Sequence, residues 1–503
     1  MKVIRYAMLV IQVWAPCAFG QFGQPSGQSQ GTQANTLPLS GRSGQSGSVA
    51  VTAAPVPGAT TSVNTINPTV QVQGPYTGSI DSTSRKPFSG KLSFQEAVQR
   101  GIAYNLGSVG AAHLARQSQG QSRVARSALL PNINGNLSET VQQTNLRAAG
   151  VRISAPIPGF SIPSIVGPFN YFDLRASLTQ NIADFTALNN YRSSQELLRA
   201  NELSIKDARD MVVLAVGGAY LQVIAAQARV ESARAQLETA EALLKQTTEQ
   251  RNAGIAAPID VNRSTVQAQM QQQRLVTLRN DLAKQKINLA RMTGLPPNDQ
   301  YELSDAAPST QEPPDSLESA IAQAFENRSD LKAAQAQVRA AERARAAARA
   351  ERWPSLAVSG NYGVIGTNPA QSHGTFGVTG TLRIPIWQGG RTEGNIEQAD
   401  AALAQRQAEV ADLRARIEAE VRSAWLDLQA ATSQVDVAQK NLDVTRQNLD
   451  LNKQRFQEGV TDNVEVVRSQ ESVAEAGLDS INSIFAQNIA RLSLARARGA
   501  TGY

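Results

Sequence analysis

The sequence predicts a mixed α/β membrane protein in which strands from several copies of the chain close one β-barrel and long helices continue it as a coiled-coil barrel. Three observations predict this fold class. The chain contains an internal two-fold repeat, each repeat holds two strands with one apolar and one polar face, and each repeat holds helices with sustained heptads. Only four strands are expected per chain, so the barrel requires several copies.

Residues 1–20 have the features of a secretory signal peptide. A basic start is followed by an apolar run and then by small residues, which is the order found in a cleaved export signal. Cys17 lies in this segment and is the only cysteine. The mature protein is therefore expected to contain no disulfide and no thiolate metal site. The residues around Cys17, Trp14 and Pro16, disfavour a lipid anchor.

Residues 21–90 are rich in Gly, Ser, Gln, Thr and Pro and contain few large apolar side chains. Such a composition buries too little surface to offset chain entropy, so this segment is expected to be disordered. A second proline-rich stretch, residues 295–315, is expected to be a linker between the repeats. The repeats then occupy residues 91–294 and 316–499, and residues 500–503 form a tail.

The two repeats follow one order of signals. Each has an amphipathic helical stretch, two alternating strands, and two long helices around a glycine turn. Phe94 matches Leu317 in this order, and Gly254 matches Gly459. A period of about 200 residues is too long for a solenoid unit. It indicates duplication of a whole half-molecule.

Alternation with period two marks the strands. Leu174, Ala176 and Leu178 are apolar while the residues between them are polar. This pattern fits a half-buried sheet on a soluble core, and it also fits a membrane strand with lipid on one side and water on the other. Residues 146–170, which contain four prolines, are expected to form a large extracellular loop. The predicted strands centre on residues 133–141, 172–182, 356–364 and 376–386.

Heptad spacing marks the helices. Large apolar residues recur at every seventh position from Val421 to Phe456, beside a row of small residues, and the first repeat has the same pattern from Val216 to Leu244. Such heptads specify a left-handed coiled coil. The longest helix, of about 60 residues or ~90 Å, equals two helices of ~50 Å placed end to end. Helices are expected at 93–129, 189–251 and 259–293, and at 315–352, 391–456 and 463–497.

The number of strands sets the number of copies. The smallest membrane barrels have about eight strands, and an open sheet edge is not tolerated in lipid. Two copies would supply about eight strands, whose interior fills with side chains, whereas three would supply about twelve and enclose an aqueous pore. The residues therefore predict an oligomeric tube, part β-barrel and part α-barrel.

From about residue 92 to 499 the chain resembles the TolC-like outer-membrane efflux proteins, also called outer membrane factors. The segment from Pro385 to Arg391 resembles that family's strand-exit motif, and the two glycine turns resemble its helical-tip motif. The resemblance implies a homotrimer with a 12-stranded barrel in outer-membrane lipid and a helical tunnel in the periplasm. It also implies two partners, a periplasmic adaptor (membrane fusion) protein and an inner-membrane transporter. The implied function is the exit duct of a tripartite efflux or secretion system.

The resemblance assigns candidate site residues to the helical tips. Family members have a Tyr, an Arg and a second acid where this chain has Phe456, Thr461 and Arg468, which predicts different closing contacts. Arg468 is expected to pair with Glu465. The acids also begin helices, where a carboxylate favours the helix dipole, so capping explains them as well. The candidate aperture residues are Asp260, Phe456, Thr461, Glu465 and Arg468. The candidate adaptor-contacting residues are Arg251, Gly254, Arg455 and Gly459.

Composition disfavours several other function classes. His113 and His373 are the only histidines, and no phosphate-binding loop or nucleophile elbow is present, so we expect no enzyme activity, no cofactor and no metal site. Basic residues are interleaved with Glu along the helices, so no nucleic-acid binding is expected. Two alternatives remain. A periplasmic structural scaffold would explain the heptads but not the strands, and a passive porin without pump partners would explain the strands but not the long helices.

Overall fold

A computed structural model describes residues 47–57, 64–80, 90–148, 150, 163–296, 301–304, 316–458, 460–461 and 463–502. The described residues divide into two compact units. One unit holds Asn132–Thr179 and Val358–Thr381, and the other holds Gly44–Pro131, Gln180–Ala357 and Leu382–Tyr503. The expected signal peptide, with Cys17, lies outside the described residues, and so does Gly459.

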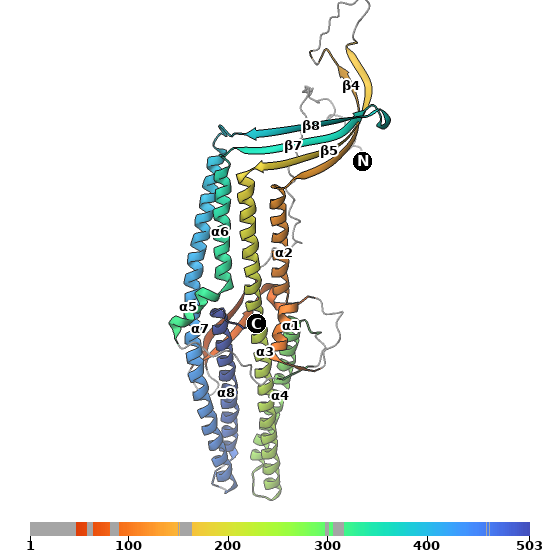
Figure 1. The fold of residues 1–503 in the computed structure, drawn as a ribbon. Helices are drawn as coiled ribbons and strands as arrows, with labels where there is room; N and C mark the ends of the chain where they lie inside the picture. Colours follow the sequence, from red (N-terminus) through yellow and green to blue (C-terminus); the bar gives the residue numbers. More distant parts are fainter. Residues whose placement is uncertain are drawn as a thin grey trace, which may run out of the picture. The chain divides into compact units, whose positions relative to one another are not determined.

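One order of elements occurs twice along the chain (Figure 1). The first half contains α1 (Phe94–Tyr104), α2 (Leu106–Ser127), β4 (Asn132–Asn145), β5 (Ile165–Ala183), α3 (Phe185–Asn252) and α4 (Pro258–Thr293). The second half contains α5 (Leu317–Asn327), α6 (Ser329–Ala350), β7 (Ser355–Gly366), β8 (His373–Arg383), α7 (Arg391–Gln457) and α8 (Asn463–Ala497). The shorter elements are β1 (Val49–Pro57), β2 (Asn64–Val72), η1 (Gly74–Thr77), β3 (Lys91–Leu92), β6 (Glu302–Leu303) and η2 (Pro369–Gln371).

The single helix predicted over 93–129 is wrong, because Asn105 divides it into α1 and α2. The backbone of Asn105 is extended, and its side-chain oxygen accepts a hydrogen bond from the Gly107 N–H at 2.9 Å, which caps α2. Its amide nitrogen donates to the Tyr76 carbonyl at 2.8 Å. Since Asn105 is fully buried, these bonds satisfy a polar group at the bend, and heptad spacing gives no sign of them.

The single helix predicted over 315–352 is also wrong, because Arg328 divides it into α5 and α6. The Arg328 guanidinium is 3% exposed and forms ion pairs with Asp330 at 2.6 Å and with Glu420 at 2.5 Å. Burial alone would raise the pKa of Asp330, but the hydrogen bond and the charge of Arg328 outweigh burial and lower that pKa. The bend is thus stabilised by a buried arginine whose charge is paired with two carboxylates.

Residues 47–80 contradict the expectation that the whole segment 21–90 is disordered. β1 and β2 form an antiparallel hairpin, and η1 follows it. Val49 is buried in the main core cluster, and Val70 packs against that cluster. A few valines are enough to pack this hairpin against the helices, so the composition of the whole segment did not predict the hairpin.

Away from the helical tips, two buried clusters hold the helical unit together. In the larger one, Tyr220 of α3 packs edge-on against Phe94 with 5.4 Å between ring centroids, and its hydroxyl donates to the Leu92 carbonyl at 2.9 Å. The smaller one joins α5, α7 and α8 around Ile417 and Leu494. Among the described helices, α3 alone has an apolar window long enough for a bilayer, and most of that window is buried in the core.

The expected linker 295–315 is partly built into this core. Leu295 and Tyr301 are buried in the larger cluster, and β6 pairs in parallel with β3.

The heptad row of small residues predicted on α3 is buried along its length, which lets neighbouring helices approach closely. Its members are Ala219, Ala226, Ala233, Ala240 and Thr247.

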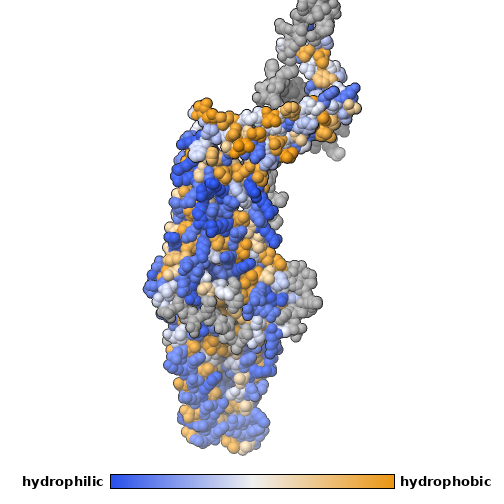
Figure 2. Space-filling model, viewed as in Figure 1, coloured by the Kyte–Doolittle hydropathy of each residue, from blue (hydrophilic) through white to orange (hydrophobic). Residues whose placement is uncertain are grey.

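The strands form one sheet in the order β4-β5-β7-β8, with β4 and β8 at its edges. Ile133 lies opposite Leu178, and Leu137 lies opposite Leu174, so these apolar residues share a face. Ile133 and Leu137 are 72% and 67% exposed, and Figure 2 shows hydrophobic residues gathered over the strands. The predicted alternation is confirmed for β4 and β5. The polar pairs on the other face are Asn134–Ser177, Asn136–Arg175 and Ser138–Asp173.

Two strand boundaries differ from the prediction. β8 ends at Arg383, so Ile386 lies beyond the strand, where it is 94% exposed. β5 begins at Ile165, so the loop expected at 146–170 is shorter, and its residues 151–162 lie outside the described chain. At β8 the apolar alternation continues past the end of the strand, whereas at β5 strand pairing begins before the predicted alternation, with Ile165 opposite Asn145.

Candidate functional site at the helical tips

The turn between α3 and α4 ends α3 with a left-handed glycine cap. Gly254 has a φ of +77° and donates its N–H to the Arg251 carbonyl at 2.9 Å, and the Ile255 N–H donates to the Gln250 carbonyl at 2.9 Å. Glycine adopts this conformation without strain, and the two bonds satisfy carbonyls that the helix end leaves free. Arg251 is exposed in the last turn of α3, so both predicted residues lie on the surface of the tip.

The turn between α7 and α8 repeats this cap as far as it is described. The Val460 N–H donates to the Arg455 carbonyl at 2.9 Å, with the same spacing as the bond from Ile255 to Gln250. Arg455 is exposed. Figure 1 shows both turns at the same end of the helical unit, as the helix lengths predict.

Each predicted acid lies in the first turn of a returning helix and is paired with an arginine three residues later. Asp260 Oδ1 lies 3.6 Å from Arg263 Nη1, and Glu465 Oε1 lies 3.2 Å from Arg468 Nη1. The expected pairing of Glu465 with Arg468 is therefore present. Arg263 makes the same pair in the first half, and the sequence analysis missed it. Each pair adds no net charge to its tip.

The two tips are joined by Asn463, which the sequence analysis also missed. Its side chain is 1% exposed, and its amide nitrogen donates to Ser264 Oγ at 2.8 Å and to the Asp260 carbonyl at 3.3 Å. Asn463 begins α8 and Ser264 lies near the start of α4, so these bonds pass from one helical hairpin to the other. An asparagine at a helix start is common, and so it gave no hint of a partner 199 residues away.

An apolar cluster beside the tips joins the same two hairpins. It consists of Leu243 from α3, Leu449 from α7 and Val466 from α8, and Phe456 packs against it. Thr461 is half-buried between the ends of α7 and α8. The structure thus pairs Glu465 with Arg468, links Asp260 to Asn463, and places Phe456 in packing contact.

A buried ion pair lies between α3 and α8, away from the tips. Arg496 is 7% exposed and donates to Asp207 at 2.9 Å. Burial raises the pKa of Asp207, and the charge of Arg496 offsets only part of that rise. Among the residues that the structure describes, no group of three or more His, Cys, Asp or Glu side chains is placed to hold a metal ion. We interpret these charges as part of the helix packing.

Comparison with known proteins gives a family match in two blocks and one similar curated protein. The family model for Outer membrane efflux protein matches residues 109–295 and 320–500, which correspond to the two halves of the fold. The chain is 27% identical over 310 residues to Outer membrane protein OprJ of Pseudomonas aeruginosa. That alignment covers 56% of this chain and 58% of OprJ, so the chain matches less than two thirds of this relative.

Solved structures share the fold at low identity. The Campylobacter jejuni CmeC outer membrane channel has a TM-score of 0.70 at 17% identity, over 81% of this chain and 86% of that chain. A membrane protein from Pseudomonas aeruginosa has a TM-score of 0.69 at 19% identity, over 81% and 93%. The outer membrane protein VceC from Vibrio cholerae has a TM-score of 0.67 at 17% identity, over 81% and 96%. These likenesses show a TolC-like fold in which helices dominate and a sheet is present.

Proposed function

We propose a function that follows from the family of this chain, since the chain belongs to the outer membrane efflux protein family. It forms an efflux channel whose sheet lies in the lipid of the outer membrane and whose helical unit forms a tunnel in the periplasm. The observation that carries this proposal is the sheet with an exposed apolar face and two edge strands. Apolar side chains on such a face favour lipid, and lipid requires that the edges be paired.

Pairing of the edges supports a homotrimer. Three copies of the four-stranded sheet supply about twelve strands, enough to enclose water, whereas two copies supply about eight. A row on α7 supports the same assembly. Val437, Val444 and Leu451 recur at every seventh position and are 65%, 54% and 57% exposed in the single chain. An exposed heptad row is a surface suited to a neighbouring copy in a coiled coil.

The helical tips are the proposed contact with the rest of an export system. Arg251 and Arg455 are exposed at two matching turns, so each chain offers two similar surfaces to a periplasmic adaptor protein. The adaptor joins the channel to an inner-membrane transporter, and the protein itself does no covalent chemistry. The acids and arginines of the returning helices line the aperture between the tunnel and its partners.

The assembly is tested with full-length protein extracted in detergent and then inserted into planar bilayers. Light scattering is expected to give a trimer, and the trimer is expected to conduct ions. A monodisperse monomer with an intact β-signal in circular dichroism would contradict the proposal. Recovery of the protein in the soluble periplasmic fraction would favour the structural scaffold. A conducting trimer whose loss leaves export by its host unchanged would favour the passive porin.

A further inference from the structure

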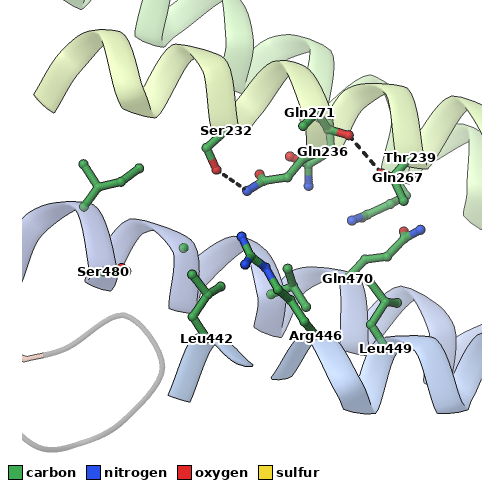
Figure 3. Close-up of a pocket in the computed structure, with 14 residues that line it drawn as sticks. Ser232, Gln236, Thr239, Gln267, Gln271, Leu442, Arg446, Leu449, Gln470 and Ser480 are labelled. Carbon is green, nitrogen blue, oxygen red and sulfur yellow. Dashed lines mark hydrogen bonds between the residues drawn. The ribbon is translucent and has the colours of Figure 1, made fainter. Parts of the chain in front are cut away.

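A cavity of about 350 Å³, partly open to solvent on the side of the exposed Arg446, lies in the helical unit between the α3–α4 hairpin and the α7–α8 hairpin (Figure 3). All four helices contribute to its walls. Leu442 and Leu449 of α7 form an apolar part of the wall, and Arg446 lies between them in the sequence. The amide groups come from Gln236, Gln267, Gln271 and Gln470. The cavity adjoins the apolar cluster beside the tips, with which it shares Leu449.

Three of these glutamines are buried and have unused hydrogen-bonding capacity. Gln267, Gln271 and Gln470 are 3%, 6% and 8% exposed. The described residues provide no partner for Gln267 Nε2, for Gln271 Oε1 or for either amide atom of Gln470. Buried amides are normally hydrogen-bonded, so unpaired ones around a cavity indicate a place where a bound molecule completes them.

Arg446 determines the charge that the cavity prefers. Figure 3 shows its guanidinium pointing into the space between the two hairpins. None of the described lining residues is acidic, and Arg446 takes part in none of the ion pairs that the described residues form. The cavity therefore combines one positive charge with amide groups and an apolar wall.

We propose that this cavity binds a small amphiphilic carboxylate. The carboxylate accepts hydrogen bonds from the Arg446 guanidinium, whose planar donors match its geometry, and from the amide groups of Gln267 and Gln470. The apolar part of the ligand lies against Leu442 and Leu449. The cavity volume is at the lower end of the range for small-molecule sites, which suits a one- or two-ring acid. Because both hairpins contact the ligand, bound ligand holds them together.

The test is calorimetric titration of the full-length protein in lipid nanodiscs with 1-naphthoate. The expected result is saturable binding, weakened by at least about tenfold in Arg446→Ala, since this variant removes a charged hydrogen-bond donor. Gln470→Leu is expected to weaken binding in the same direction. Arg446→Lys, which keeps the charge but loses the planar fork, is expected to bind with intermediate affinity. The matched control is Arg414→Ala, an exposed arginine of α7, which is expected to bind like the unmodified protein.

Two further measurements keep the outcome decisive. Light scattering of each variant checks that assembly is intact, so a loss of binding is not a loss of folding. The neutral analogue 1-naphthamide is expected to bind at least about tenfold more weakly than 1-naphthoate, because it lacks the charge that Arg446 pairs with. Equal affinity of the acid and the amide would overturn the proposal. So would equal affinity in Arg446→Ala and the unmodified protein, or no saturable binding at millimolar 1-naphthoate.

Discussion

The contact between the two helical tips depends on Asn463, and its removal has a predictable size. Asn463→Ala deletes the hydrogen bonds to Ser264 Oγ and to the Asp260 carbonyl. Each such bond contributes about 1 kcal/mol net. The Ser264 hydroxyl still donates to the Asp260 carbonyl at 3.0 Å, so no buried hydroxyl is stranded. We therefore expect a cost of about 1–2 kcal/mol, which shifts the balance between joined and separated tips by about 5- to 30-fold.

The separation of the tips can be measured directly. Ile255 and Val460 are 78% and 64% exposed at the two turns, so both accept a cysteine and a spin label. Because the sequence contains only Cys17, which we expect to leave with the signal peptide, labelling is specific. Asn463→Ala is expected to add a population at longer distances in pulsed electron resonance. Asn262→Ala, an exposed asparagine of the first tip, is the matched control and is expected to leave the distances unchanged.

The same experiment separates this bond from the apolar cluster beside it. If the distances are unchanged in both Asn463→Ala and Ser264→Ala, the reasoning is refuted, and the cluster of Leu243, Leu449 and Val466 alone holds the tips together. If the hydrogen bond between Asn463 and Ser264 holds the tips together, the double variant Asn463→Ala with Ser264→Ala is expected to open the tips little more than either single variant. Both substitutions remove the same interaction.

Three further predictions concern charge, packing and pH. Arg263→Ala and Arg468→Ala each leave an acid unpaired, so both variants are expected to raise cation selectivity in planar bilayers, whereas Glu465→Ala is expected to lower it. Reversal potentials in a salt gradient measure the selectivity. No shift of the reversal potential in any of the three variants would mean that these residues only cap helices. Deletion of residues 47–72 removes Val49 from the core and Val70 from its packing against the core. Full burial of Val49 alone is worth roughly 1.5–3 kcal/mol, so the apparent melting temperature of the trimer is expected to fall. An unchanged value would show that the hairpin is dispensable. Asp330→Asn is expected to lower stability by about 2–4 kcal/mol at pH 7 because a buried partner of Arg328 is lost. The pKa of Asp330 is lowered in the fold, so its contribution is full above the unfolded-state value of about 3.9 and declines as pH falls below that value. A difference in stability that does not shrink as pH falls below about 3.9 would contradict this cause.

The long helices and the sheet could be predicted because their signals are local and repeated. The heptad row from Val421 to Phe456 lies within α7, which the structure ends at Gln457. Alternation in β5 similarly predicted which side chains share a face, because a strand turns successive side chains to opposite sides. Many residues contribute to each of these signals, so the exact behaviour of one residue matters little.

The breaks and the tip contact could not be predicted because each depends on one residue and a distant partner. Arg328 ends a helix where it meets Glu420, 92 residues away, and nothing in the intervening sequence marks that pair. Asn463 was missed for the same reason. Arg263 is a different case, because its partner Asp260 lies only three residues earlier, and that spacing could have been read from the sequence. The hairpin at 47–72 was missed because composition describes a whole segment, whereas its packing depends on a few valines.

The two returning helices begin with different residues, and this breaks the equivalence of the two halves. At the position where α8 begins with Asn463, four residues after the turn glycine, α4 begins with Pro258. Proline has neither an N–H nor a donating side chain. In the proposed trimer, α4 cannot offer to the neighbouring chain the amide bond that Asn463 makes within its own chain. In that trimer the Asn463 bond would join the two hairpins within each chain, and no matching bond from the start of α4 would join one chain to the next.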